Sequence, residues 1–181
     1  MLGGEHTVNR IVFPYIYGSF VVYFVARETP LTPQNDYEKG RKYKKMLTHN
    51  TKRRHISEHV KNDTLYNFEA IRGANEIILT EGVTDCISLA NLGLKTISPV
   101  TKKYSQKEFE IIKTHIPKSK DIIIMNDNEL NNEGSKSALK MAEELSLEGY
   151  QVKVIPIPLD EVRQKKRLLC EQLEEQNESN D

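Results

Sequence analysis

The chain has 181 residues, of which 38% are hydrophobic and 29% charged, and its formal net charge is zero. This length allows one well-buried domain with a small appendage and excludes a large multidomain machine, and no apolar run approaches the roughly 18 residues that a membrane span requires. Cys86 and Cys170 stand far apart without a CxxC pair, and no histidines stand at metal-ligand spacing, which argues against a disulfide framework and against zinc in this chain.

The N-terminal part begins with two predicted strands. Its first residues lack the basic start and long apolar segment of a secretory signal, so we expect a cytoplasmic protein with no membrane partner. RIVFPYI (10–16) and SFVVYFVARE (19–28) are dense in β-branched and aromatic residues around a Tyr-Gly pair, which predicts a hairpin. Residues 29–63 have little apolar periodicity and predict loop with short helical pieces. LYNFEAIRGA (65–74) predicts a short helix that ends the first subdomain.

Strand and helix patterns alternate after residue 75. The predicted strands are 76–80, 95–100, 121–127 and 151–158, and the predicted helices are 84–93, 105–115 and 135–149. Such alternation predicts an α/β fold with a four-stranded parallel sheet flanked by helices. The last segment, 160–181, carries a helical apolar stripe before a polar end, which predicts a C-terminal helix and a disordered tail.

Charge divides unevenly between the two predicted domains. Residues 1–75 carry 12 Lys and Arg against 7 Asp and Glu, whereas residues 76–181 carry 14 against 19. We therefore predict a small, β-rich, basic α+β subdomain (1–74), an acidic α/β domain (75–159) and a C-terminal helix and tail (160–181). A basic part suits a phosphate backbone and an acidic part suits metal cations. Ordinary variation of surface charge is the competing interpretation.

Carboxylates follow two of the predicted strands. Glu81 and Gly82 come after 76–80, with Asp85 in the first turn of the next helix, and Asp127-Asn128-Glu129 ends the third strand. In an open parallel sheet, strand ends meet at one edge, and alternation sends Asp127 and Glu129 to the same side. Oxygen ligands of this kind suit Mg²⁺, with Glu81 completing the site or transferring a proton beside it. Each acid taken alone could instead cap a helix.

The same residues resemble the TOPRIM domain. IILTEGVTDCISLANLGL looks like its first motif, a strand that runs into Glu-Gly and a helix with Asp four residues on, and DIIIMNDNELNNEGSKSA resembles its second, a strand ending in Asp-x-Asp. The resemblance implies a Rossmann-like sheet and magnesium-dependent phosphodiester chemistry. Glu129 replaces the second Asp, and the loop to Gly134 is longer than usual. Both departures bear on the metal geometry.

The preceding segment resembles the one that stands before TOPRIM in DnaG-type primases. In order, the matching residues are Arg10, Phe13 and Pro14; Arg27; Lys42 and Tyr43; and Lys61, Leu65 and Tyr66. The resemblance covers roughly residues 10 to 158. It implies a DNA primase catalytic core, a nucleotidyltransferase that joins ribonucleotides into a primer on single-stranded DNA.

The resemblance also implies roles for single residues. Asp127, Glu129 and Glu81 are the expected catalytic residues, and with Asp85 they are the expected ligands of Mg²⁺ or Mn²⁺. The expected nucleic-acid and nucleotide contacts are Arg10, Arg27, Lys42 and Lys61. The expected partners are single-stranded DNA, nucleoside triphosphates and a replicative helicase. A TOPRIM-type nuclease and a catalytically weak nucleic-acid-binding module are the alternatives.

Overall fold

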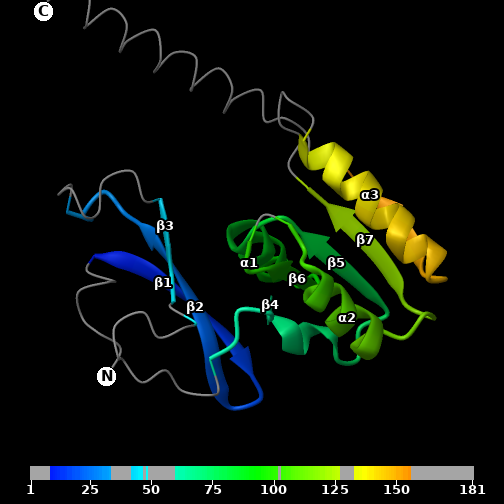
Figure 1. The fold of residues 1–181 in the computed structure, drawn as a ribbon, viewed down its shortest axis with the longest axis horizontal. Helices are drawn as coiled ribbons and strands as arrows, with labels where there is room; N and C mark the ends of the chain where they lie inside the picture. Colours follow the sequence, from blue (N-terminus) through cyan, green and yellow to red (C-terminus); the bar gives the residue numbers. More distant parts are fainter. Residues whose placement is uncertain are drawn as a thin grey trace, which may run out of the picture.

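The structure, a computed structural model, describes residues 9–33, 42–46, 48, 60–101, 103–126 and 133–155. Within these ranges the chain forms two sheets, a three-stranded one near the N-terminus and a five-stranded one that carries the helices (Figure 1). No helix among the described residues is long and apolar enough to cross a membrane. The C-terminal helix and tail predicted for 160–181 lie outside the described residues.

The N-terminal sheet contains the predicted hairpin. Strands β1 (Arg10–Tyr17) and β2 (Phe20–Glu28) pair antiparallel around Gly18, whose φ of +59° suits glycine in a tight turn. A third strand, β3 (Tyr43–Lys45), pairs with the end of β2. The sequence predicts loop or short helix here, and the difference has a physical cause. Three residues carry too little pattern of their own, so β3 depends on the edge that β2 offers.

The second sheet has the order β4-β6-β5-β7-β8. Its parallel strands are β5 (Glu76–Thr80), β6 (Thr96–Pro99), β7 (Asp121–Met125) and β8 (Gln151–Val154). They confirm the predicted four-stranded parallel sheet. The fifth, β4 (Leu65–Tyr66), pairs antiparallel with β6 and leads into the 3₁₀ helix η1 (Phe68–Ile71). The helix predicted for 65–74 is therefore mostly wrong, because Leu65 is fully buried against the sheet.

Three α-helices flank this sheet, α1 (Val83–Asn91), α2 (Gln106–His115) and α3 (Glu133–Leu147) (Figure 1). Ser105 caps α2, and Glu108 completes a capping box. Isoleucines of α2 and small or flexible apolar residues of α3 share one core cluster with Ile77, Leu79 and Ile122. Alternation along the strands turns Thr80 and Thr96 the other way, toward α1, where the Cys86 thiol donates to the Thr96 carbonyl.

The arrangement of the helices determines where a site can form. The connection after β5 runs through α1 to β6, whereas the connection after β7 runs through α3 on the opposite face to β8. The two loops therefore diverge between the neighbouring strands β5 and β7. In doubly wound sheets, the crevice at such a point, beyond the carboxyl ends of the strands, is where ligands bind.

Contacts of buried aromatic and aliphatic side chains join the two sheets. Tyr15 of β1 is 1% exposed, packs edge-on against Tyr66 with 5.4 Å between ring centroids, and donates a 3.1 Å hydrogen bond to the Pro99 carbonyl. Val25 and Val100 belong to the same cluster. Burial raises the pKa of Tyr15 well above its ordinary value, so its hydroxyl remains a donor. The N-terminal sheet is thus held directly beside the carboxyl end of β6.

Candidate active site

The turn after β5 presents two carboxylates. Glu81 follows the strand directly, and Gly82 begins α1 in an extended conformation, with φ −131° and ψ 156°. Asp85 returns to this turn from the helix, because a Cβ placed on Gly82 would lie 2.9 Å from Asp85 Oδ2. Glu81 is partly buried, and its Oε2 atom is shielded from solvent. The glycine therefore lets the Asp85 carboxylate lie against the backbone beside Glu81.

The neighbouring strand β7 leads toward the same edge. Thr80 of β5 pairs with Met125 of β7, so Glu81 and Asn126 leave the sheet from adjacent positions. Asn126 is 7% exposed, and its Nδ2 donates to the Gly134 carbonyl at 3.3 Å, which ties the end of β7 to the start of α3. The predicted adjacency of the two strand ends is thus observed.

Asp127 and Glu129 lie outside the described residues. Their convergence with Glu81 and Asp85 remains a prediction. Among the residues that are described, no three His, Cys, Asp or Glu side chains form a group that could hold a metal ion.

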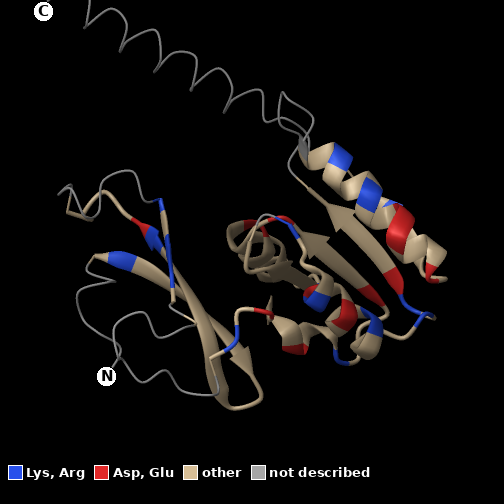
Figure 2. Cartoon of the chain, in the orientation of Figure 1, with Lys and Arg blue, Asp and Glu red and all other residues tan. Residues whose placement is uncertain are grey.

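A cleft of about 670 Å³ lies between the two sheets and brings predicted residues from both together. Glu81 and Asp85 line one side, and Arg27, Lys42 and Lys45 line the other. Figure 2 shows Lys and Arg gathered on β3 and the adjoining end of β2. An acidic wall therefore faces a basic wall across one cavity.

Tyr43 stands within the basic wall. It pairs with Arg27 in the β2–β3 ladder, and its ring lies 5.8 Å from the Arg27 guanidinium carbon and 6.0 Å from Lys42 Nζ. The side chain is 37% exposed and lines the cleft. Tyr43 is therefore exposed in the cleft and not packed in a core. Cation–π contact of this kind holds both cations beside an aromatic face.

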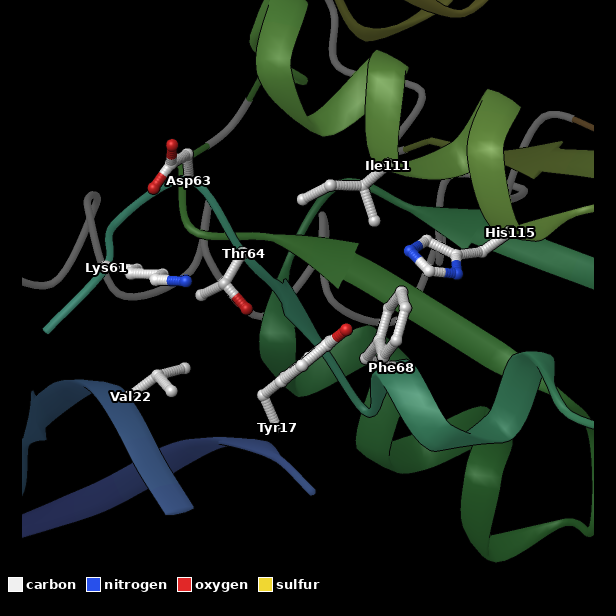
Figure 3. A pocket seen from close by; sticks show the side chains of 8 residues that line it. All are labelled: Tyr17, Val22, Lys61, Asp63, Thr64, Phe68, Ile111 and His115. Atoms are coloured by element: carbon white, nitrogen blue, oxygen red, sulfur yellow. The ribbon is translucent and has the colours of Figure 1, made fainter. Parts of the chain in front are cut away.

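Two predicted contact residues lie elsewhere. Lys61 lines a smaller pocket of about 200 Å³ with Tyr17, Phe68 and His115, between the hairpin tip and α2 (Figure 3). Arg10 is 8% exposed, and its guanidinium lies 3.5 Å from the Ala26 carbonyl. Neither residue lines the cleft. Sequence order along a chain does not reveal on which side of a strand or linker a cation stands, and here the fold separates these two from Arg27 and Lys42.

Several cleft residues were missed in the sequence. Tyr15, Thr84, Ser88 and Thr101 line it, although their local patterns are those of ordinary strand and helix residues. Glu108 supports the rim: its carboxylate accepts hydrogen bonds from the Val100 amide at 3.0 Å and the Ser105 amide at 2.7 Å. Burial raises the pKa of Glu108, and those hydrogen bonds oppose the rise. Glu108 stands three residues after the capping Ser105, and this spacing is the one local signal that the sequence holds for it.

Comparison with known proteins adds to this geometry. Residues 78–166 match the model of the Toprim-like family. The Aquifex aeolicus primase, in a structure of its zinc-binding and RNA polymerase domains, superposes with a TM-score of 0.62 and 22% identity over 84% of this chain and 35% of that chain. The RNA polymerase domain of Mycobacterium tuberculosis primase DnaG gives 0.58 and 17% over 83% and 48%. No curated protein matches the sequence.

The chain has the fold of a DnaG-type primase core. The resemblance predicted from the sequence is thereby confirmed at the level of the fold. The Mycobacterium tuberculosis domain is also similar in its complex with double-stranded DNA, with a TM-score of 0.62, 17% identity and coverage of 83% of this chain and 46% of that one. This primase-like chain spans about a third to a half of the length of these solved chains.

Proposed function

We propose that this chain is the catalytic core of a DNA primase that joins ribonucleotides into a short primer on single-stranded DNA. One observation carries the proposal. In a primase-like fold, the cleft between the two sheets places Arg27, Lys42 and Lys45 opposite Glu81 and Asp85. Polymerisation of nucleoside triphosphates needs both walls, because cations attract the phosphates while carboxylates hold the metal that balances their charge.

The residues at the carboxylate wall fit a hard divalent cation. Glu81 and Asp85 offer oxygen ligands, and Asp127 and Glu129 follow the adjacent strand end one and three residues after Asn126. Mg²⁺ or Mn²⁺ prefers such oxygen donors. When bound, the metal would neutralise the triphosphate and align the attacking 3′-hydroxyl oxygen.

The basic wall supplies orientation. Arg27, Lys42 and Lys45 would bind the template backbone or the triphosphate, and pyrophosphate leaves as the new phosphodiester bond forms. The exposed face of Tyr43 lies in the same wall and could support a base by stacking. Lys61 and Arg10 lie outside the cleft, so the proposal gives them no part in the chemistry. A replicative helicase partner remains a prediction of the resemblance, and a cytoplasmic location remains a prediction from the N-terminal sequence.

A primer-synthesis assay tests the proposal. The protein is incubated with single-stranded DNA, labelled ribonucleotides and Mg²⁺, and the products are separated by length. We expect short labelled products that vanish without Mg²⁺ and in Glu81→Gln, a substitution that removes the charge but keeps the shape. Circular dichroism checks that the variant retains the fold.

The same experiment separates the alternatives. In a parallel incubation with end-labelled template and no nucleoside triphosphates, shortening of the template would indicate the nuclease. Binding of template with neither synthesis nor cleavage would indicate the catalytically weak module. Full primer yield from Glu81→Gln would remove Glu81 from the mechanism.

A further inference from the structure

The backbone on both sides of Glu81 contacts buried or partly buried hydroxyl groups. On one side, the Thr80 carbonyl accepts a hydrogen bond from the Tyr104 hydroxyl at 3.1 Å. On the other, the Gly82 carbonyl lies 3.2 Å from Thr80 Oγ1. The peptide unit before Glu81 and the peptide unit after Gly82 are therefore each within reach of a side-chain hydroxyl.

These hydroxyls also connect the turn to the neighbouring strand. Pairing of β5 with β6 extends through Leu79 and Ile97. Immediately beyond, the Tyr104 hydroxyl lies 3.2 Å and Thr80 Oγ1 lies 3.3 Å from the Ile97 carbonyl. The two hydroxyls thus continue the connection between the strands past the end of the ladder, where the chain turns toward the cleft.

Tyr104 is itself held in place. It lies between β6 and the capped start of α2, and its ring packs edge-on against Phe109 with 6.2 Å between centroids. Burial raises its pKa well above the ordinary value, so the hydroxyl keeps its proton and remains a donor. A hydroxyl on a packed ring can restrain a carbonyl more firmly than water can, because the ring is already immobilised when the protein folds and loses no further conformational entropy on making the hydrogen bond.

We propose that Tyr104, with Thr80, is a positioning residue that sets the Glu81–Gly82 turn for metal binding. Tyr104 is not among the residues that line the cleft, so its effect would pass through the backbone of the turn. The inference rests on the proposed function for its link to metal, whereas the restraint on the turn itself can be measured without any metal.

Tyr104→Phe tests the inference, and the chain offers a matched control. Tyr150 is a buried tyrosine at the opposite end of the sheet, and its hydroxyl lies 2.9 Å from the Ile116 carbonyl and 3.3 Å from the Lys113 carbonyl. Tyr150→Phe therefore removes an equivalent bridging hydroxyl far from the turn. Both variants keep the ring, so their melting temperatures should fall by similar amounts.

Two measurements on the 181-residue protein decide the outcome. The first is hydrogen exchange at the Cys86 amide, which donates to the Gly82 carbonyl at 3.1 Å and so reports on the turn. The second is the affinity for Mn²⁺ by calorimetry. For the loss of one hydrogen bond, we expect about two- to tenfold faster exchange and weaker Mn²⁺ binding in Tyr104→Phe, with no change in Tyr150→Phe.

The contrary results are distinct. Unchanged exchange at Cys86 in Tyr104→Phe, or equal effects in the two variants, would overturn the positioning role. If the wild-type protein binds no Mn²⁺, the proposed function fails. The exchange rates at the Cys86 amide still test whether Tyr104 restrains the Glu81–Gly82 turn. Should Tyr104→Phe not fold, Thr80→Val removes the other hydroxyl at nearly constant volume, and Thr80→Ser, which keeps it, should restore the wild-type exchange rate.

Discussion

Gly82→Ala isolates the close approach of Asp85 to the backbone of the turn. The added Cβ would lie 2.9 Å from Asp85 Oδ2, about 0.5 Å inside the 3.4 Å at which ordinary contact begins. The backbone itself tolerates alanine, because φ −131° and ψ 156° belong to the extended region. The substitution must therefore be relieved by rotation of the Asp85 side chain.

The expected magnitudes separate stability from metal binding. An off-rotamer Asp85 side chain destabilises the folded state by about 0.5–1.5 kcal/mol. Replacing glycine by alanine stabilises the protein by about 0.4–1 kcal/mol, because it reduces the conformational entropy of the unfolded chain. The free energy of unfolding should thus change by less than about 1 kcal/mol, or roughly 2–4 °C in melting temperature. A displaced carboxylate ligand should weaken Mn²⁺ binding by about tenfold, which corresponds to about 1.4 kcal/mol.

Calorimetric titration with Mn²⁺ measures the affinity, and thermal unfolding followed by circular dichroism measures the stability. The control is Gly82→Ala in an Asp85→Ala background, where the alanine has no carboxylate to displace and should have little further effect on affinity. Displacement of Asp85 by the added methyl group is refuted if Gly82→Ala binds Mn²⁺ as tightly as the wild type, or if it weakens binding equally in both backgrounds.

Further outcomes are expected for Arg27, Lys61 and Cys86. Arg27→Ala should weaken single-stranded DNA binding in fluorescence anisotropy, with a shallower dependence on salt, and unchanged affinity would leave Arg27 a structural role. Lys61→Ala should have a smaller effect in the same assay, because Lys61 lines the other pocket, and equal losses would contradict the assignment of the cleft. Burial raises the pKa of the Cys86 thiol from 9.0 to about 11, so alkylation at about pH 8 should be about a hundredfold slower than in urea. The folded state binds the Cys86 thiol proton more tightly than the unfolded state does. The protonated thiol therefore contributes its full share to the free energy of unfolding below pH 9, and this share is lost as the pH rises toward 11. Cys86→Ala should reduce that loss of stability at high pH.

The parallel sheet could be predicted because its signals are local. The apolar strand Glu76–Thr80 has the predicted bounds, and Ser105 caps α2 where a serine stands before the helical pattern. Strands buried on both faces need continuous apolar runs, and helices need caps, so both leave marks in adjacent residues. The placement of Glu81 and Asp85 at a strand end follows from the same signals.

Short strands and the choice among cations could not be predicted in this way. β3 and β4 exist because β2 and β6 offer them edges. Lys44 and Lys45 are neighbours in sequence, yet Lys44 is 8% exposed while Lys45 lines the cleft, since alternate residues of a strand face opposite sides. The basic N-terminal segment predicts affinity for phosphate, but its sequence does not indicate which of its cations face Glu81 and Asp85 across the cleft.

Sequence alone determined the order of the four parallel strands and of the three α-helices between them, the acidic residues at the end of β5 and the likeness to primase cores, because these depend on neighbouring residues and on short motifs. Tertiary structure decided that Arg27 and Lys42 face Glu81 while Lys61 and Arg10 do not. It also brought the Tyr104 hydroxyl to the Thr80 carbonyl across 24 residues of chain. Such contacts join residues that are distant in the sequence and are brought together by tertiary packing, and no local sequence pattern indicates which residues will meet in this way.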